Sequence, residues 1–316
     1  MHQSVPGWSG FCNVAQSGQM IRPSSIGYLP VIPSSPTELS TVYTLLTRSL
    51  ATADQLNQHD VVIVLDQAIY AKALDIVWKH PVQFQRIVLR MGAFHVACTF
   101  LAVIGKRFGD AGLRDILVES RVVGPAAVGS VLKGKHYNRA LRCRKLLLDA
   151  LFQVRWCACE DWFEQKGIVS DDTLKDALAA MRCELTKEKM ISVGRHQHFT
   201  ALFQLFVSFE ESKGSITSRF WSSYTEMVSL LLRFIQATRE GHWKQHLACI
   251  RKILPWMFAY DRHNYSRNLS YYWCTMMNLQ SSHPEAYVNL LLESLLFSAA
   301  HVHLASWHLI SPLSRQ

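Results

Sequence analysis

The stretch QHDVVIVLDQAIYAKAL, residues 58–74, decides how the fold is interpreted, because a strand-like run is followed directly by a helix-like run. Residues 61–66, VVIVLD, are apolar and largely β-branched up to the final aspartate, which predicts a strand buried on both faces. Residues 67–80 have helical spacing and end before Pro81. Asp66 stands between the two. It is expected either to cap the helix or to serve as one member of a metal-binding carboxylate set.

The neighbouring segments extend this pattern into a small α/β layer. Residues 86–92 predict a second strand, so that residues 61–92 form a parallel strand–helix–strand crossover. A helix is expected over residues 36–56, and residues 26–32 are expected to form a short extended strand. The chain beyond is predicted to be almost wholly helical, over residues 93–108, 137–156, 172–185, 199–212, 222–241, 242–260 and 283–297. The predicted fold class is therefore α+β, mostly helical, with a short sheet.

Composition narrows the class of protein. Hydrophobic residues make up 49% of the 316-residue chain, which is enough to bury a core and argues against disorder. The net charge of +9 favours contact with polyanions such as nucleic acid. The eight cysteines include no CxxC pair, so no structural metal site is predicted. P-loop, GxSxG, HExxH and dinucleotide-binding motifs are all missing from the sequence, which excludes those enzyme classes.

Two sequence features bear on location. The chain opens without a signal peptide, so a nuclear or cytoplasmic protein that is not secreted is expected. Residues 286–310 are largely apolar but contain an asparagine, a glutamate and three histidines. Because a charge at the centre of a membrane helix costs about 3 kcal/mol, this segment is expected to be a packed helix, with no membrane as partner.

Six stretches of the sequence are distinctive in wording: GYLPVIPSSPTE (27–38), DQAIYAKA (66–73), LRMGAFH (89–95), GKRFGDAGLRDILVES (105–120), GKHYNRALR (134–142) and YDRHNYSRNL (260–269). They resemble a large family of uncharacterised animal proteins, with fungal relatives, that looks derived from transposable elements. The resemblance covers about residues 5–292. The order of helix 36–56, strand 61–66, helix 67–80 and strand 86–92 is also similar to the middle of the ribonuclease H-like fold of DDE transposases.

The resemblance implies a domain organisation. Residues 1–95 are expected to form an incomplete ribonuclease H-like core segment. Residues 96–280 are expected to form a large all-α insertion domain, as is familiar among DDE transposases. Residues 281–316 are expected to supply a C-terminal helix and a divergent tail.

The resemblance also implies where a catalytic site once lay. A DDE site needs three carboxylates to hold two Mg²⁺ ions. Asp66 matches the acid that ends a central strand, and the next strand leads to His95, a possible neighbour in the same site. No acid precedes residue 37 and none follows Glu293, so the carboxylate set is incomplete. The chain is therefore expected to be catalytically inactive, with Asp66 a remnant and no metal bound. The alternative is an active Mg²⁺-dependent nuclease or transposase completed by other acids, such as Glu285 or Glu293.

One basic run stands out in the remaining sequence. Residues 133–145, KGKHYNRALRCRK, contain no acid, and an apolar stripe through Tyr137, Leu141, Leu148 and Phe152 is expected to face the core. The basic side chains are expected either to contact nucleic-acid phosphates, DNA being the partner considered, or to form a solvated helix face. The second alternative corresponds to a helical interaction or structural protein that does not bind nucleic acid. The candidate phosphate-binding residues are Lys133, Lys135, Arg139, Arg142, Arg144 and Lys145.

Overall fold

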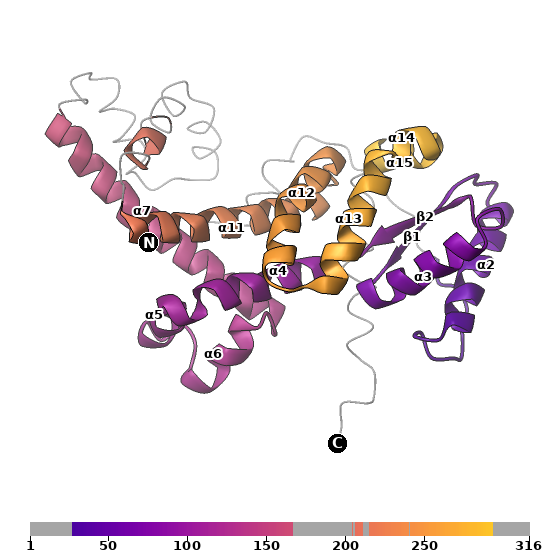
Figure 1. Ribbon diagram of the computed structural model, residues 1–316, viewed down its shortest axis with the longest axis horizontal. Coiled ribbons are helices and arrows are strands. Elements are labelled where there is room, and N and C mark those ends of the chain that lie inside the picture. The colour runs from indigo at the N-terminus through magenta and orange to yellow at the C-terminus, as the bar shows by residue number, and fades with distance from the viewer. Residues whose placement is uncertain (1–26, 167–203, 205, 211–214, 240, 293–316) are drawn as a thin grey trace, which may run out of the picture. The chain divides into compact units, whose positions relative to one another are not determined.

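The computed structural model describes residues 27–166, 204, 206–210, 215–239 and 241–292. Its fold is α+β and mostly helical, with a two-stranded parallel sheet, which confirms the predicted class (Figure 1). In chain order the elements are α2 (Leu39–Gln55), β1 (Val61–Leu65), α3 (Gln67–Lys79), β2 (Ile87–Met91), α4 (Ala93–Phe108), the kinked turn η1 (Gly109–Leu113), α5 (Arg114–Glu119), α6 (Pro125–Leu132), α7 (Tyr137–Lys166), α11 (Ile216–Arg239), α12 (Trp243–Ala259), α13 (His263–Met277), α14 (Leu279–Ser282) and α15 (Pro284–Leu292).

The chain divides into two compact units. One contains residues 22–144 and 226–316, and the other contains residues 1–21 and 145–225. This division differs from the predicted boundary at residue 95. The physical reason is that α13 packs against α3 and β2 and α12 packs against α4, so helices distant in sequence complete the core around the strands.

The parallel sheet forms as the local sequence predicts, but β1 is half-buried from Val61 to Val64 and is not covered on both faces as expected. β1 and β2 are parallel and in register from Val61 opposite Ile87 to Leu65 opposite Met91. α3 connects them, and α2 packs against α3 and β1. All five residues of β2 are buried, so this strand is covered on both faces.

The strand predicted over residues 26–32 is wrong for residues 27–32, which form no regular element. Tyr28 and Val31 are 89% and 86% exposed, so this segment has no apolar surface to pack against. Pro30 has no backbone N–H to contribute to a ladder. A short apolar run therefore stays outside the sheet when nothing pairs with its backbone.

A buried polar network joins β2 to the helices that cover it. Arg90 on β2 is only 8% exposed, and its guanidinium carbon lies 4.9 Å from the centre of the Trp243 ring. It also hydrogen-bonds to the Tyr272 side chain. His246 is buried beside it, with Nδ1 3.0 Å from Oγ1 of Thr238. These contacts offset the cost of burying a charge next to the sheet.

Helix α4 is held by two close backbone approaches. The Leu132 carbonyl at the end of α6 touches α4 at Gly105, where an alanine Cβ would stand 1.8 Å from the carbonyl oxygen. Gly134 in the following turn has φ +76°, and a Cβ there would stand 2.6 Å from the Cys98 carbonyl oxygen. Glycine is required at both positions, and the α6–α7 turn is thereby positioned on α4.

The smaller unit has its own apolar cluster. Cys159 and Phe163 of α7 are buried together with Phe206 and Phe209. Arg155 donates to Glu210 Oε1 over 2.9 Å, and it also donates to the Thr225 and Ser222 hydroxyls. The predicted helix 172–185 lies outside the described residues, as does part of helix 199–212.

Two further observations concern single helices. Pro255 lies inside α12, which continues to Ala259, so the proline does not end this helix. Helix α13 was not predicted, and it proves central to the packing of the sheet. Within the part of the chain that the structure describes, no helix combines the length and apolar character needed to cross a membrane.

Candidate functional site at the sheet edge and the basic turn

Asp66 is the N-cap of α3. Its backbone is extended, with φ −66° and ψ 167°, and its Oδ1 accepts a hydrogen bond from the Ile69 N–H at 2.8 Å. Its carbonyl accepts from the Tyr70 N–H at 2.8 Å, which starts the helical ladder. The predicted cap is confirmed. One carboxylate oxygen is occupied by the helix, and the side chain is half-buried.

The second strand ends at the same edge of the sheet. Gly92 follows β2 and donates its N–H to the Leu65 carbonyl at 2.7 Å, and α4 begins at the next residue. His95 lies in the first turn of α4, where it is exposed and meets the edge of the Phe94 ring at 5.5 Å between ring centres. Because the strands are parallel, Asp66 and His95 lie near neighbouring carboxyl ends, as the sequence predicted.

Helix α13 closes this edge with Tyr265. Burial raises the pKa of Tyr265 above its ordinary value, a hydrogen bond with Thr99 lowers it, and the charges of Cys98 and Asp66 raise it further. Burial alone raises the pKa of Cys98 to about 11, so its thiol stays protonated at neutral pH. The edge therefore offers one carboxylate, an exposed imidazole and neutral polar groups.

Glu285, the described acid that could complete a metal site, does not lie at this edge. Glu285 lies in the first turn of α15, where the next residue, Ala286, donates its N–H to Asp60 Oδ2 at 3.2 Å. Asp60 precedes β1 and Asp66 follows it, so about 20 Å of strand separates them at about 3.3 Å per residue. Glu293 lies outside the described residues. Among the residues described, no three His, Cys, Asp or Glu side chains are grouped to hold a metal ion.

The cap makes a direct prediction about stability. Asp66→Ala should lower the free energy of unfolding by about 1 kcal/mol, because the Ile69 N–H loses its acceptor, whereas Asp66→Asn should change it by a few tenths of that amount. Urea denaturation of both variants measures the difference. Equal and large losses in both would show that the charge of Asp66, and not its capping geometry, stabilises the fold.

The basic run forms the α6–α7 turn and the first turns of α7, and we call its exposed cations the basic turn. Four of the six candidate side chains are exposed: two lie in the turn before α7, where His136 has φ +55°, and two lie in the first turns of α7. Lys145 is half-buried near Asp149. Burial raises the pKa of the Asp149 carboxyl, and the Lys145 charge partly opposes this rise. The basic turn consists of Lys133, Lys135, Arg139 and Arg142.

Arg144 does not belong to the basic turn, contrary to the sequence interpretation. It is 0% exposed, and its Nη2 would lie 3.1 Å from a Cβ placed on Gly105. The buried face of this helix contains Ala140, Cys143 and Arg144, not the predicted stripe, whose Tyr137 and Leu141 are only half-buried and whose Phe152 is 45% exposed. The glycine on α4 leaves room for the guanidinium, and no local pattern in the sequence indicates that space.

The structure adds residues to this site that the sequence interpretation missed. Arg239, the last residue of α11, approaches the Tyr137 phenol, whose pKa is raised by burial and lowered by the Arg239 charge. The Tyr137 ring lies 5.0 Å from Phe94, which in turn contacts His95. A chain of aromatic rings therefore links the sheet edge to the basic turn, and one exposed arginine joins it from a helix about 100 residues later.

Comparison with known proteins identifies a family without a known activity. The model of the family described as Domain of unknown function (DUF8702) matches residues 7–301, which is most of the chain. No curated protein and no solved structure matches the chain significantly.

Proposed function

The chain belongs to the family of the DUF8702 domain. From its sequence resemblance and its surface charge, we propose that it is a catalytically inactive, transposase-derived protein that binds nucleic acid through the basic turn. The observation that carries the proposal is the group of four exposed Lys and Arg side chains at the α6–α7 turn, within a run that contains no acid. Exposed cations release condensed counterions when they neutralise phosphates, which supplies most non-specific affinity.

Two features support phosphate contact at this turn. Arg139 and Arg142 are three residues apart on one face of the start of α7, and Lys133 and Lys135 lie in the turn that leads into it, so these exposed cations can follow one backbone together. The close approach of Gly134 and Gly105 to their neighbours fixes the turn on α4, so the cations are presented from a rigid support. Arg239 extends the positive surface beside Tyr137.

The sheet edge supports the inactive part of the proposal. Asp66 is engaged as a helix cap, and Glu285 lies beyond the opposite end of β1. A two-metal site needs carboxylates that converge on ions about 4 Å apart. We therefore propose that the strand–helix–strand layer is the remaining part of a ribonuclease H-like core without cleavage activity, and that the protein binds nucleic acid at the basic turn instead. Metal-dependent strand cleavage that is lost in Asp66→Ala would overturn the inactive assignment.

The basic turn predicts a specific salt dependence. Replacing Lys135, Arg139 and Arg142 by alanine removes up to three phosphate contacts, so the slope of log K against log salt for a mixed-sequence duplex should flatten by about 2–3 units. The fold should survive, because these side chains are exposed and alanine is a good helix former. Fluorescence anisotropy at several salt concentrations measures the slope.

A matched control uses three cations elsewhere in the same unit. Arg48, Lys79 and Arg114 are exposed and lie on α2, α3 and α5, outside the basic turn. Their replacement by alanine changes the net charge equally but should leave the slope nearly unchanged. Equal slopes in the two triple variants would show that the basic turn is only a solvated face.

A further inference from the structure

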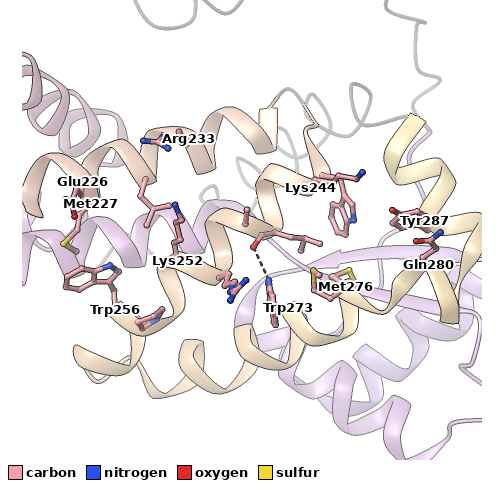
Figure 2. A pocket seen from close by; sticks show the side chains of 17 residues that line it. Glu226, Met227, Arg233, Lys244, Lys252, Trp256, Trp273, Met276, Gln280 and Tyr287 are labelled. Atoms are coloured by element: carbon pink, nitrogen blue, oxygen red, sulfur yellow. Dashed lines mark hydrogen bonds between the residues drawn. The ribbon is translucent and has the colours of Figure 1, made fainter. Parts of the chain in front are cut away.

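A large groove runs along the second half of the larger unit, away from any residue singled out by the sequence. It has a volume of about 990 Å³ and is lined by side chains of α11, α12, α13, α14 and α15. Figure 2 shows Trp256 near one end, close to Glu226 and Met227, and Trp273 near the middle. Gln280 and Tyr287 lie at the other end. We call this feature the α12 groove.

The lining of the α12 groove has the composition of a protein interface. Three tryptophans and three methionines are among its lining residues, and such residues are enriched at the cores of interfaces. Met277 is 57% exposed at the end of α13, which is unusual for a large apolar side chain that serves only the core. Trp273 is fixed in place, because its Nε1–H donates to the Leu247 carbonyl at 3.1 Å. The groove thus combines a fixed aromatic anchor with adaptable thioethers.

Charge determines which partner fits. Among the described residues that line the groove, Arg233, Lys244, Arg251 and Lys252 are exposed cations, and Glu226 is the single acid. We call these four exposed cations the rim of the groove. Figure 2 shows two of them, Arg233 and Lys252, together with the indoles of Trp256 and Trp273. A partner must therefore be negatively charged along the rim and apolar toward the floor.

The spacing of the cations on α12 favours a helical partner. Lys244 and Arg251 are seven residues apart, so they lie about 10 Å apart along the helix on one face. Carboxylates seven residues apart on a second helix have the same spacing. An amphipathic helix laid along α12 would place its acids against this row and its apolar stripe against the methionines and tryptophans.

We propose that the α12 groove is a docking site for an acidic amphipathic helix of a partner protein. This site is separate from the basic turn, and it does not depend on nucleic-acid binding there. Trp243 is only 5% exposed, and Trp256 and Trp273 are half-buried, so the groove offers little open aromatic face for the base stacking that gives single-stranded nucleic acid its affinity, and a peptide is favoured.

The test uses the full-length chain and a designed peptide of about 20 residues, long enough to follow α12, with Leu and Met at helical spacing and Glu on the flanking positions. A scrambled peptide of the same composition has no apolar stripe and serves as the ligand control. The protein variant Arg251→Glu/Lys252→Glu reverses the charge of the rim. The variant Arg48→Glu/Lys79→Glu makes the same change in net charge on exposed positions outside the groove.

Binding of the ordered peptide should weaken at least tenfold in the groove variant and less than twofold in the control variant. Met277→Glu, an exposed substitution at the groove, should also weaken binding tenfold or more, because it removes an apolar contact and adds a like charge. Circular dichroism checks that each variant is folded.

Several outcomes would overturn the proposal. The ordered peptide could fail to bind, or it could bind no better than its scrambled form. The two charge-reversal variants could weaken binding equally, which would indicate non-specific attraction. Binding of a single-stranded oligonucleotide, or self-association of the chain, could depend on the groove residues while peptide binding does not.

Discussion

Gly105→Ala should destabilise the protein by at least about 3 kcal/mol, which is a large part of the stability of a typical domain. The added Cβ would stand 1.8 Å from the Leu132 carbonyl oxygen and 2.7 Å from its carbon. Both are backbone atoms, so neither can move aside as the end of a flexible side chain could. The end of α6 must then separate from α4, and the space that holds the buried Arg144 side chain changes with it.

A second glycine provides the control for this prediction. Gly129 lies in α6, and a Cβ built there has no atom within 4 Å. Gly129→Ala should stabilise the protein by about 0.4–1 kcal/mol, because alanine lowers the entropy of the unfolded chain. Urea denaturation compares the two variants with the parent protein. If Gly105→Ala proves as stable as Gly129→Ala, the close approach of α6 to α4 is wrong.

The buried tyrosines should make the larger unit unfold in alkaline solution. Tyr70 is 1% exposed and Tyr272 is 0% exposed. Burial raises the pKa of both phenols above the ordinary value, and for Tyr272 the Arg90 charge and hydrogen bond partly oppose this rise. Above about pH 10 the unfolded chain loses phenol protons that the folded protein keeps. Below about pH 10 the buried phenols therefore do not lower the free energy of unfolding. It should fall by about 1.4 kcal/mol per pH unit for each such tyrosine as the pH rises toward the folded pKa.

Tyr70→Phe isolates one of these groups. The substitution keeps the ring, which meets Tyr272 edge-on at 6.3 Å, and removes one ionisable phenol. The fall in the free energy of unfolding between about pH 10 and about pH 11 should become smaller by about 1 kcal/mol, because the unfolded phenol is half-ionised at the lower pH. Tyr28→Phe is the control, because Tyr28 is 89% exposed and should leave the slope unchanged. A slope that Tyr70→Phe does not alter would show that the Tyr70 phenol is accessible to solvent.

These expectations depend on contacts between segments that are distant in the chain. Gly105 and Leu132 lie on different helices, and Tyr70 and Tyr272 are about 200 residues apart. Neither pair has a sequence signature. Both pairs become visible only when the backbone positions are known, because close packing depends on the shape of two surfaces and not on the periodicity of one.

Some features of the candidate site follow from local sequence, and others depend on contacts between distant segments. The cap at Asp66 follows from a local pattern, an aspartate between an apolar strand and a helix, and local hydrogen bonding decides it. Lys135, Arg139 and Arg142 are exposed, as the sequence interpretation expected for these polar side chains. The burial of Arg144 was not expected, since it depends on the space beside Gly105 on another helix. The α12 groove combines side chains from five helices, so no local stretch of the sequence indicates it.

The sequence by itself determined the parallel strand–helix–strand unit, the helical character of the rest, the cap of α3 and the positive charge of the α6–α7 turn. Each of these depends on residues within a few positions of one another, where backbone geometry and hydrophobic periodicity act directly. Only the tertiary structure decided that residues 27–32 remain outside the sheet, that Arg144 is buried, that Glu285 lies beyond the opposite end of β1 from Asp66, and that α12 borders a groove. Each of these depends on which distant surfaces meet, and the free energy that decides it is spread over many contacts that no local window of sequence contains.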